Sequence, residues 1–276
     1  MELTLPVTLA VLGAAFLHAC WNALLKSSSD KQLDTVAISV GAGIVGLAVA
    51  IWLPPPARES WPWLAASAAV HVAYFAFLGG AYHWGELSYA YPIMRGGGPV
   101  IVALCSAAVF GEVFGPLQSL GVGLVCAGIV AFAYGRHDRR ATFFALANAV
   151  VIAAYTLIDA RGARASHSPV AYAMWFFFAQ ALTVSAFAGW RRGREVQRYL
   201  VRNWPRIFIG AVFTAGSYAV ALWAMTRAPV ALVAVLRETA VLFGALIGVL
   251  VLREAVTLRR LVATGAVVAG LVALKL

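Results

Sequence analysis

Two arginines, Arg95 and Arg237, lie in the middle of apolar segments. A charged side chain in hydrocarbon is costly, so it normally faces other protein groups or a water-filled cavity. The guanidinium is a permanent cation whose five donors match the geometry of a carboxylate. We therefore expect both arginines to line a polar cavity at membrane depth, where Arg95 anchors the carboxylate of a substrate. An internal ion pair or the capping of a carbonyl is the alternative role for Arg95.

The two arginines belong to an internal repeat with an offset of 142 residues. The same offset separates three further pairs: Glu112 and Glu254, Gly123 and Gly265, and Gly128 and Gly270. The stretches 94–131 and 236–273 are thus two copies of one pattern, in which an arginine, an apolar helix, a glutamate and a Gly-rich apolar helix follow one another. Charged groups at matching places in two repeats are typical of membrane transporters with a cavity between the repeats.

The composition is that of a membrane protein. The 276 residues are 62% hydrophobic and 12% charged, with a mean hydropathy of +0.85, whereas soluble domains carry about 25% charged residues. An apolar run of roughly 17–25 residues can span a bilayer as a helix. We predict ten such helices and no soluble domain: residues 5–25, 35–54, 62–83, 88–110, 116–134, 142–160, 170–190, 207–226, 229–252 and 257–275.

Basic residues in the connections set the predicted orientation. Most of the 21 lysines and arginines fall in connections on one side of the membrane, above all in residues 190–206. Basic loops of membrane proteins face the cytoplasm, so both termini are predicted to lie on the opposite, external side. The first apolar segment lacks a basic start and a cleavage site, and we interpret it as a mature helix rather than a signal peptide.

An odd number of helices in each repeat gives the two halves inverted topology, because the second copy enters the membrane from the opposite side. The predicted fold is therefore an all-α membrane protein with ten transmembrane helices in two inverted five-helix repeats around a central cavity. The first repeat is expected at residues 1–134, the connecting loop at 135–141 and the second repeat at 142–276.

Polar aromatic side chains follow one face of the third predicted helix. His71, Tyr74, Leu78 and Tyr82 are spaced by 3, 4 and 4 residues, which places them on a single helical face. Such a face suits an aromatic or amphipathic small molecule, and a seam between helices is the alternative. The other predicted cavity residues lie on the first, fourth, sixth and eighth helices: His18, Trp21, Asn22, Tyr91, Tyr155, Thr214 and Tyr218.

Two acidic residues fall within or beside the predicted spans. Glu238 follows Arg237 directly, and consecutive residues of a helix point about 100° apart, so a pair between these two is not expected. Glu238 is therefore either paired elsewhere or a proton-binding group that couples transport. Asp159 lies one turn beyond Tyr155 and nearer the external surface, where we expect it at the membrane interface.

Glycine and proline predict flexible points in two helices. Gly79 and Gly80 lie near the end of the third segment, and Pro92 with residues 96–99 interrupts the fourth. Non-helical backbone at membrane depth is tolerated only against protein or water. We expect hinges at five glycines, with close helix packing as the alternative: Gly79, Gly80, Gly96, Gly97 and Gly98.

Several chemistries are not indicated by the sequence. Cys20, Cys105 and Cys126 lie in apolar segments without metal-ligand spacing, and no phosphate-binding glycine loop is present. We therefore expect no metal, no other cofactor and no catalytic residues. The positive charge lies in short loops, so nucleic acid is not an expected partner. The aromatic run at residues 175–178 is expected to face lipid.

The pattern as a whole resembles the drug/metabolite transporter superfamily, in its ten-helix EamA-type branch. Each repeat ends its fourth helix at a glutamate, in the sequences Phe110-Gly111-Glu112 and Leu252-Arg253-Glu254, and a Gly-rich helix follows. Within that branch the chain is most similar to the aromatic amino acid exporters of Gram-negative inner membranes. The resemblance implies that helices 1, 3, 4, 6, 8 and 9 surround the cavity. One departure is that Arg237-Glu238-Thr239 stands where the first repeat has Arg95-Gly96-Gly97.

The sequence and the resemblance together predict an inner-membrane carrier that exports small amphipathic metabolites by alternating access. Aromatic or other apolar amino acids are the expected substrates, and export is implied by the resemblance alone. A multidrug or sugar-conjugate transporter of the same superfamily is the alternative, whereas an intramembrane enzyme lacks a constellation of acids, nucleophiles or metal ligands. The expected partners are the small-molecule substrate and the lipid bilayer, and the expected oligomeric state is a monomer.

Overall fold

The computed structural model describes residues 3–28, 30–131, 133, 138–250 and 258–275. Every regular element in these residues is a helix. The helices are α1 (Leu5–Lys26), α2 (Lys31–Ala50), a short 3₁₀ turn η1 (Arg58–Ser60), α3 (Trp61–Trp84), α4 (Leu87–Phe110), α5 (Pro116–Val130), α6 (Arg139–Ala165), α7 (Pro169–Arg202), α8 (Trp204–Met225), α9 (Val230–Arg237), α10 (Ala240–Leu250) and α11 (Leu258–Lys275).

Local sequence explains where these helices begin and end. Five of them carry proline at their first or second position, where its missing N–H has no helical partner to lose: α1, α3, α5, α7 and α8. The helix α4 ends at Gly111, whose φ of 68° lies in the left-handed region that glycine adopts without strain. Proline and glycine thus separate the apolar runs.

The protein crosses the membrane several times. Eight helices in the described residues are long and apolar enough to span a bilayer, and α5 and Leu261–Leu274 of α11 are shorter apolar helices. A helix suits the hydrocarbon core of the bilayer, because it satisfies its backbone N–H and C=O groups within its own segment. The expectation of an all-helical membrane protein is confirmed.

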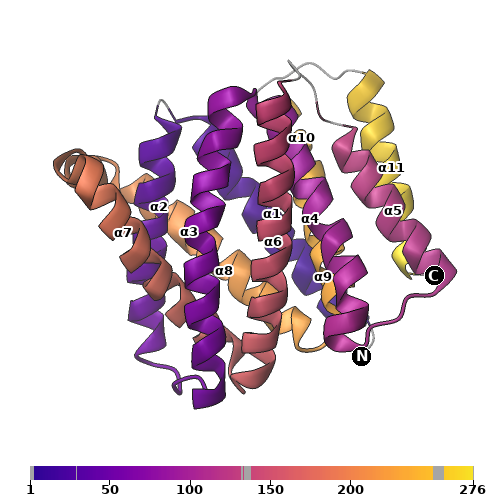
Figure 1. Cartoon of the computed structure of the whole chain (residues 1–276), viewed down its shortest axis with the longest axis horizontal. Coiled ribbons are helices and arrows are strands. Elements are labelled where there is room, and N and C mark those ends of the chain that lie inside the picture. The colour runs from indigo at the N-terminus through magenta and orange to yellow at the C-terminus, as the bar shows by residue number, and fades with distance from the viewer. Residues whose placement is uncertain (1–2, 29, 132, 134–137, 251–257, 276) are drawn as a thin grey trace.

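The helices form three groups across the bundle (Figure 1). The pair α2 and α7 lies on one flank, and the pair α5 and α11 lies on the opposite flank. Between them stand α1, α3, α4, α6, α8, α9 and α10. Contacts between sequence-distant helices dominate: α3 and α4 pack on α6, whereas α8 and α10 pack on α1. The candidate polar residues therefore come from helices that meet at the centre.

The flank formed by α5 and α11 is a seam of small residues. A Cβ built on Gly121 would lie 2.8 Å from the carbonyl oxygen of Gly270, and one built on Gly270 would lie 2.7 Å from that of Gly121. Seven residues along α5, a Cβ on Gly128 would lie 2.9 Å from the carbonyl oxygen of Ala263. These distances are too short for any side chain, so glycine allows the two backbones to approach.

The substitution Gly121→Ala is expected to destabilise this seam by roughly 1–3 kcal/mol, because the added methyl group overpacks against backbone. Gly123→Ala, two residues along the same helix, is the matched control, since no atom lies within 4 Å of its Cβ position. The control should be neutral or slightly stabilising, as alanine favours helix. Thermal unfolding of the detergent-solubilised proteins compares the two, and equal midpoints would contradict the contact.

The helix break lies in a different place from the one predicted. The helix α4 runs without interruption from Leu87 to Phe110, through Pro92 and the glycines at 96–98. The predicted ninth span instead consists of α9 and α10, separated at Glu238 and Thr239. There the amides of both residues bond to carbonyls three positions earlier, Val235 at 3.0 Å and Leu236 at 3.2 Å. Such tight turns inside a helical segment are frequent at functional hinges.

Two other boundaries differ from the sequence prediction. The helix α6 begins at Arg139, within the predicted loop 135–141, of which residues 135–137 lie outside the described residues. The helix α7 continues to Arg202, so that the predicted polar connection 190–206 is mostly helical. Loss of hydrophobicity ends a membrane span but not a helix, because arginine and glutamate favour helix in water.

Candidate functional site

A buried ion pair joins the two halves of the chain at the centre of the bundle. Arg95 on α4 forms a bidentate ion pair with Glu238, which lies in the break between α9 and α10. Nη2 of Arg95 lies 2.7 Å from Oε1 of Glu238, and Nε donates to Oε2 at 2.9 Å. The side chains are only 11% and 6% exposed. In a bidentate pair of this kind, both carboxylate oxygens bond to the guanidinium. Of the two roles considered for Arg95, the structure thus contains the internal ion pair.

The second arginine has a different environment. Arg237 is the last residue of α9, is half-buried, and has no carboxylate within ion-pair distance among the described residues. Its guanidinium carbon lies 5.4 Å from the centroid of the Tyr218 ring, in a cation–π contact. The C-terminal end of a helix carries partial negative charge, which helps to hold the cation. Among the described residues, Arg237 thus forms no ion pair and contacts the Tyr218 ring.

The internal repeat accounts for this difference between the two arginines. Arg95 and Arg237 occupy equivalent positions, and the equivalent of Glu238 in the first repeat is Gly96. The ion pair Arg95–Glu238 therefore has no counterpart, because the residue that would face Arg237 in the same way has no side chain. Within the described ranges, the departure noted in the sequence thus leaves Arg237 without the carboxylate that Arg95 has.

Aromatic side chains from α3, α4 and α6 form a wall beside the arginines. Tyr74, Leu78, Tyr91 and Tyr155 pack with Met94 in one hydrophobic cluster. The rings of Tyr74 and Tyr155 are 5.9 Å apart and nearly perpendicular, an arrangement that aromatic pairs prefer. The tyrosines of this cluster lie within electrostatic range of Arg95. The structure thus brings together five of the predicted residues.

His71 is buried and packs against the aromatic wall. Its ring lies 4.3 Å from that of Tyr155 and 4.8 Å from that of Phe176, and its Nδ1 is 2.9 Å from the carbonyl oxygen of Ser67. Tyr82, at the far end of the predicted face, is 38% exposed. The face predicted on α3 therefore runs from a buried histidine to an exposed tyrosine.

The predicted residues of α1 contact one another. Trp21 donates its indole N–H to Nδ1 of His18 at 3.1 Å, and the side-chain amide of Asn22 donates to the carbonyl oxygen of His18 at 2.7 Å. His18 lies within electrostatic range of both Arg95 and Arg237, so α1 also borders the central arginines. Thr214 on α8 is half-buried, and its buried hydroxyl oxygen has no hydrogen-bond partner within the described part of the chain.

The glycines predicted as hinges lie inside continuous helices in close contact with their neighbours. A Cβ on Gly96 would lie 2.8 Å from Val130, one on Gly97 3.0 Å from Ala149, and one on Gly98 2.8 Å from Ile152. On α3, a Cβ on Gly80 would lie 2.5 Å from Phe144, while Gly79 has open space around it. Four of the five glycines thus permit close packing in this conformation.

The carboxylate of Asp159, predicted at the membrane interface, lies inside the protein. Its side chain is 0% exposed. Its Oδ1 accepts a hydrogen bond from the Tyr172 hydroxyl at 2.9 Å, and its Oδ2 accepts one from the Tyr218 hydroxyl. The helix α6 continues past the predicted end of the span to Ala165, so that the helix extends beyond Asp159.

Tyr172 was missed altogether. The short connection between α6 and α7 makes these two helices antiparallel neighbours, and this spacing is the sequence signal that could have paired Tyr172 with Asp159. Phe176 and Phe177, expected to face lipid, are 1% and 4% exposed and lie 5.5 Å and 5.7 Å from the Tyr218 ring. The inward face of α7 therefore supports the site.

Glu112 stabilises one end of the bundle. Its carboxylate accepts hydrogen bonds from the backbone amides of Val230 at 2.9 Å and Ala231 at 3.4 Å, at the start of α9, and pairs with Arg164 of α6 at 3.1 Å. A carboxylate at a helix N-terminus satisfies free amides and complements the helix dipole. The related Glu254 lies outside the described residues.

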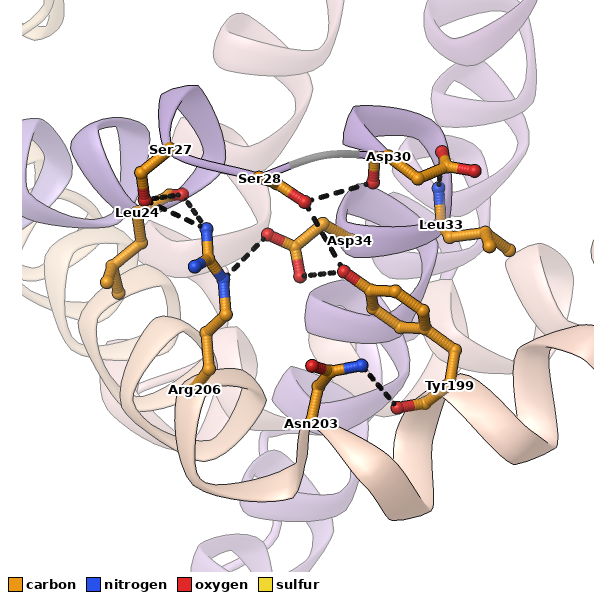
Figure 2. A network of polar contacts seen from close by, with 9 residues as sticks. All are labelled: Leu24, Ser27, Ser28, Asp30, Leu33, Asp34, Tyr199, Asn203 and Arg206. Carbon is orange, nitrogen blue, oxygen red and sulfur yellow. Dashed lines mark hydrogen bonds and ion pairs between the residues drawn. The ribbon is translucent and has the colours of Figure 1, made fainter.

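A second polar network ties the helices together at the opposite end (Figure 2). Asp34 of α2 is 0% exposed and accepts from Arg206 Nε of α8 at 3.1 Å and from the Tyr199 hydroxyl of α7 at 3.2 Å. Arg206 also donates to the Ser27 hydroxyl at 3.1 Å and to the carbonyl oxygen of Leu24, so that α1 joins the network. This network links four helices from both halves of the chain.

Removal of the cation from this network is expected to destabilise the protein. Arg206→Ala leaves the buried carboxylate of Asp34 without its cation, at a cost of about 2–4 kcal/mol. The exposed Arg202, one turn earlier in the chain, is the matched control, because its truncation removes a solvated charge. A midpoint of thermal unfolding that falls for Arg206→Ala and stays constant for Arg202→Ala supports the network, whereas equal midpoints would contradict it.

No group of three or more His, Cys, Asp and Glu side chains that could hold a metal occurs in the described ranges. The central site consists instead of one ion pair, one unpaired arginine and aromatic side chains with hydroxyl tips. Such a set binds and orients a small molecule through charge, hydrogen bonds and ring contacts.

Comparison with known proteins places the chain in a family. A family model described as "EamA-like transporter family" matches residues 139–276, which are half of the chain. A solved structure titled only "Crystal structure of protein" is 21% identical, with 98% of each chain covered and a TM-score of 0.75, which shows a shared fold. No curated protein matches the chain. On the strength of the family match, the chain belongs to the EamA-like transporter family.

Proposed function

We propose that this membrane transporter is a carrier for small amphipathic metabolites that bear a carboxylate. The observation that carries the proposal is Arg237, a half-buried cation at a helix break that has no carboxylate partner among the described residues. An uncompensated cation at membrane depth is costly, and a bound anion removes that cost. The paired Arg95 holds Glu238 away, so the substrate carboxylate binds Arg237 rather than Arg95.

The aromatic wall supports the substrate class. Tyr74, Tyr91 and Tyr155 present rings and hydroxyl groups within range of the central arginines. A planar or branched apolar side chain gains contact with such rings, and its polar groups find hydroxyl partners. Aromatic or other apolar amino acids combine a carboxylate with an apolar side chain within one small molecule. We propose them as substrates, with export as the direction.

The proposed architecture has ten membrane crossings in two inverted repeats. The seam of α5 and α11 supports it: Gly121 contacts Gly270 and Gly128 contacts Ala263, and the 142-residue offset converts each contact into the other. The contacts between helices also repeat in the two halves of the chain. The contacts of α3 and α4 with α6 correspond to those of α8 and α10 with α1. The repeats then occupy residues 1–134 and 142–276.

Alternating access would use the two polar networks at opposite ends of the bundle. The Asp34–Arg206 network joins α1, α2, α7 and α8 at one end, and the Glu112–Arg164 network joins α4, α6 and α9 at the other. A carrier opens one end at a time, so one network must separate while the other holds. Because basic connections face the cytoplasm, we propose that the Asp34 network lies on the cytoplasmic side of a bacterial inner membrane and that both termini are periplasmic. One chain contains the whole site, which favours a monomer.

Counterflow in proteoliposomes tests this function. Liposomes loaded with unlabelled tryptophan, phenylalanine or alanine are diluted into the radiolabelled compound, with a cationic dye as the competing substrate class. We expect saturable exchange of the aromatic amino acids in the wild type. Movement of the dye or of a sugar conjugate, without amino acid exchange, would retain the fold and replace the substrate class with the multidrug or sugar-conjugate alternative.

A further inference from the structure

Asp159 is a buried carboxyl group that the proposed substrate site does not use. Its side chain is 0% exposed, and its two oxygens accept hydrogen bonds from Tyr172 of α7 and Tyr218 of α8. No cation lies within ion-pair distance of it among the residues that the structure describes. Two phenol donors lower the cost of a buried negative charge but leave the charge in place, whereas a bound proton removes it.

The groups around this carboxyl come from every neighbouring helix. The helix α3 contributes Ser67, with His71 next to it, and α9 contributes Arg237, whose charge acts on Asp159 over a longer distance. The two basic residues that follow Asp159 on α6 are engaged elsewhere, since Arg164 pairs with Glu112 and Arg161 donates to the carbonyl oxygen of Val109. On α4, the charge of Arg95 is compensated by Glu238. Arg237 is therefore the cation that influences Asp159.

We infer that Asp159 is a proton-binding site of the carrier, linked through Tyr218 to the anion site at Arg237. This inference rests on the proposed function. The ring of Tyr218 lies 5.4 Å from the Arg237 guanidinium, and the hydroxyl of the same residue donates to Asp159. One side chain thus touches both the cation that receives the substrate and the carboxyl that receives the proton.

The sign of the linkage follows from the charges. The positive charge of Arg237 favours the ionised form of Asp159, and an anion bound at Arg237 compensates that charge. Anion binding therefore promotes proton binding, and by reciprocity a proton on Asp159 promotes anion binding. The proton moves from water to the carboxylate, and no covalent bond other than O–H forms or breaks. Substrate and proton then cross the membrane together, in the direction that their combined gradients favour.

Infrared difference spectroscopy tests the proton site without any substrate. The purified protein is titrated between about pH 4 and about pH 9, and the C=O stretch of a protonated carboxylic acid is followed. We expect a titrating band in the wild type and in the exposed control Glu59→Gln, and its loss in Asp159→Asn, which keeps the size of the side chain. In Tyr172→Phe the band should persist at a changed frequency, because one hydrogen bond is lost. The absence of a band in the wild type, or its retention in Asp159→Asn, would overturn the assignment.

Proton movement during net substrate efflux tests the linkage, because exchange carries a proton in each direction and leaves no net signal. Liposomes loaded with tryptophan and a pH-sensitive dye are diluted into substrate-free buffer, and we expect alkalinisation of the compartment that loses substrate. Asp159→Asn should retain substrate efflux but lose the proton signal. Net substrate efflux without proton movement in the wild type would refute the linkage. A wild type that exchanges none of the amino acids would refute the proposed function instead, and the infrared titration would still decide the proton site.

Discussion

Arg237→Ala should abolish the selectivity of the carrier for carboxylate-bearing substrates. Arg237 is the central cation that has no carboxylate partner in the described part of the chain. A charge-assisted bond of this kind contributes about 1.5–3 kcal/mol, so the apparent affinity for tryptophan should fall by about 10-fold to 100-fold. Arg237→Lys should retain part of the affinity, because the charge remains while the planar fork is lost.

The test compares tryptophan with tryptamine, which lacks the carboxylate, as inhibitors of counterflow. The wild type should prefer tryptophan, whereas Arg237→Ala should bind both compounds similarly. Arg227→Ala is the matched control: this exposed arginine also contacts an aromatic ring, at 5.7 Å from Trp223, but lies beyond the end of α8. An Arg237→Ala protein that still prefers tryptophan would show that the carboxylate binds elsewhere.

Single substitutions in the ion pair between Arg95 and Glu238 should destabilise the protein more than any other change described above. Arg95→Ala leaves a buried carboxylate, and Glu238→Gln leaves a buried guanidinium without its counter-charge, since the side chains are 11% and 6% exposed. Loss of one partner from a buried pair costs about 3–5 kcal/mol. The double variant Arg95→Ala with Glu238→Gln should recover part of the stability, because no charge remains uncompensated.

Thermal unfolding of the four detergent-solubilised proteins measures this coupling as a double-mutant cycle. Additive effects of the two single variants would contradict a direct pair. Arg95→Ala should also lower transport, although Arg95 does not bind the substrate in the proposed mechanism. The freed Glu238 adjoins Arg237 in the break between α9 and α10 and then competes with the substrate carboxylate. Restoration of transport in the double variant distinguishes this effect from the loss of a binding residue.

The sequence was sufficient to predict an all-helical membrane protein, and it singled out several residues that meet at the centre of the bundle. Helical membrane segments follow from hydropathy, and the offset between Arg95 and Arg237 identified the polar centre before any coordinates. The sequence did not predict which side chain pairs with each charged residue. Spacing along one helix shows which residues share a face, but Glu238 reaches Arg95 only through the packing of α4 against α9. Helices far apart in sequence determine such contacts.

The differences between prediction and structure concern where a helix is interrupted and what a polar residue contacts. Pro92 and the glycines of α4 suggested an interruption, yet α4 continues through them in close contact with its neighbours. The actual break, at Glu238 and Thr239, occurs in a sequence with neither proline nor glycine. Asp159 lies near the end of the apolar run, and the structure adds that the helix continues and that Tyr172 of the next helix donates to this carboxylate.

The length of α7 has a consequence for how the protein sits in its bilayer. The helix has 34 residues, which corresponds to about 51 Å at 1.5 Å per residue, against about 30 Å of hydrocarbon. Its last turns therefore stand among the lipid headgroups and carry the exposed Arg194, Arg198 and Arg202. Anionic phospholipids attract such residues, and salt screens the attraction. The same turns hold Tyr199 against Asp34, so the lipid composition of the leaflet bears on the stability of that end of the carrier.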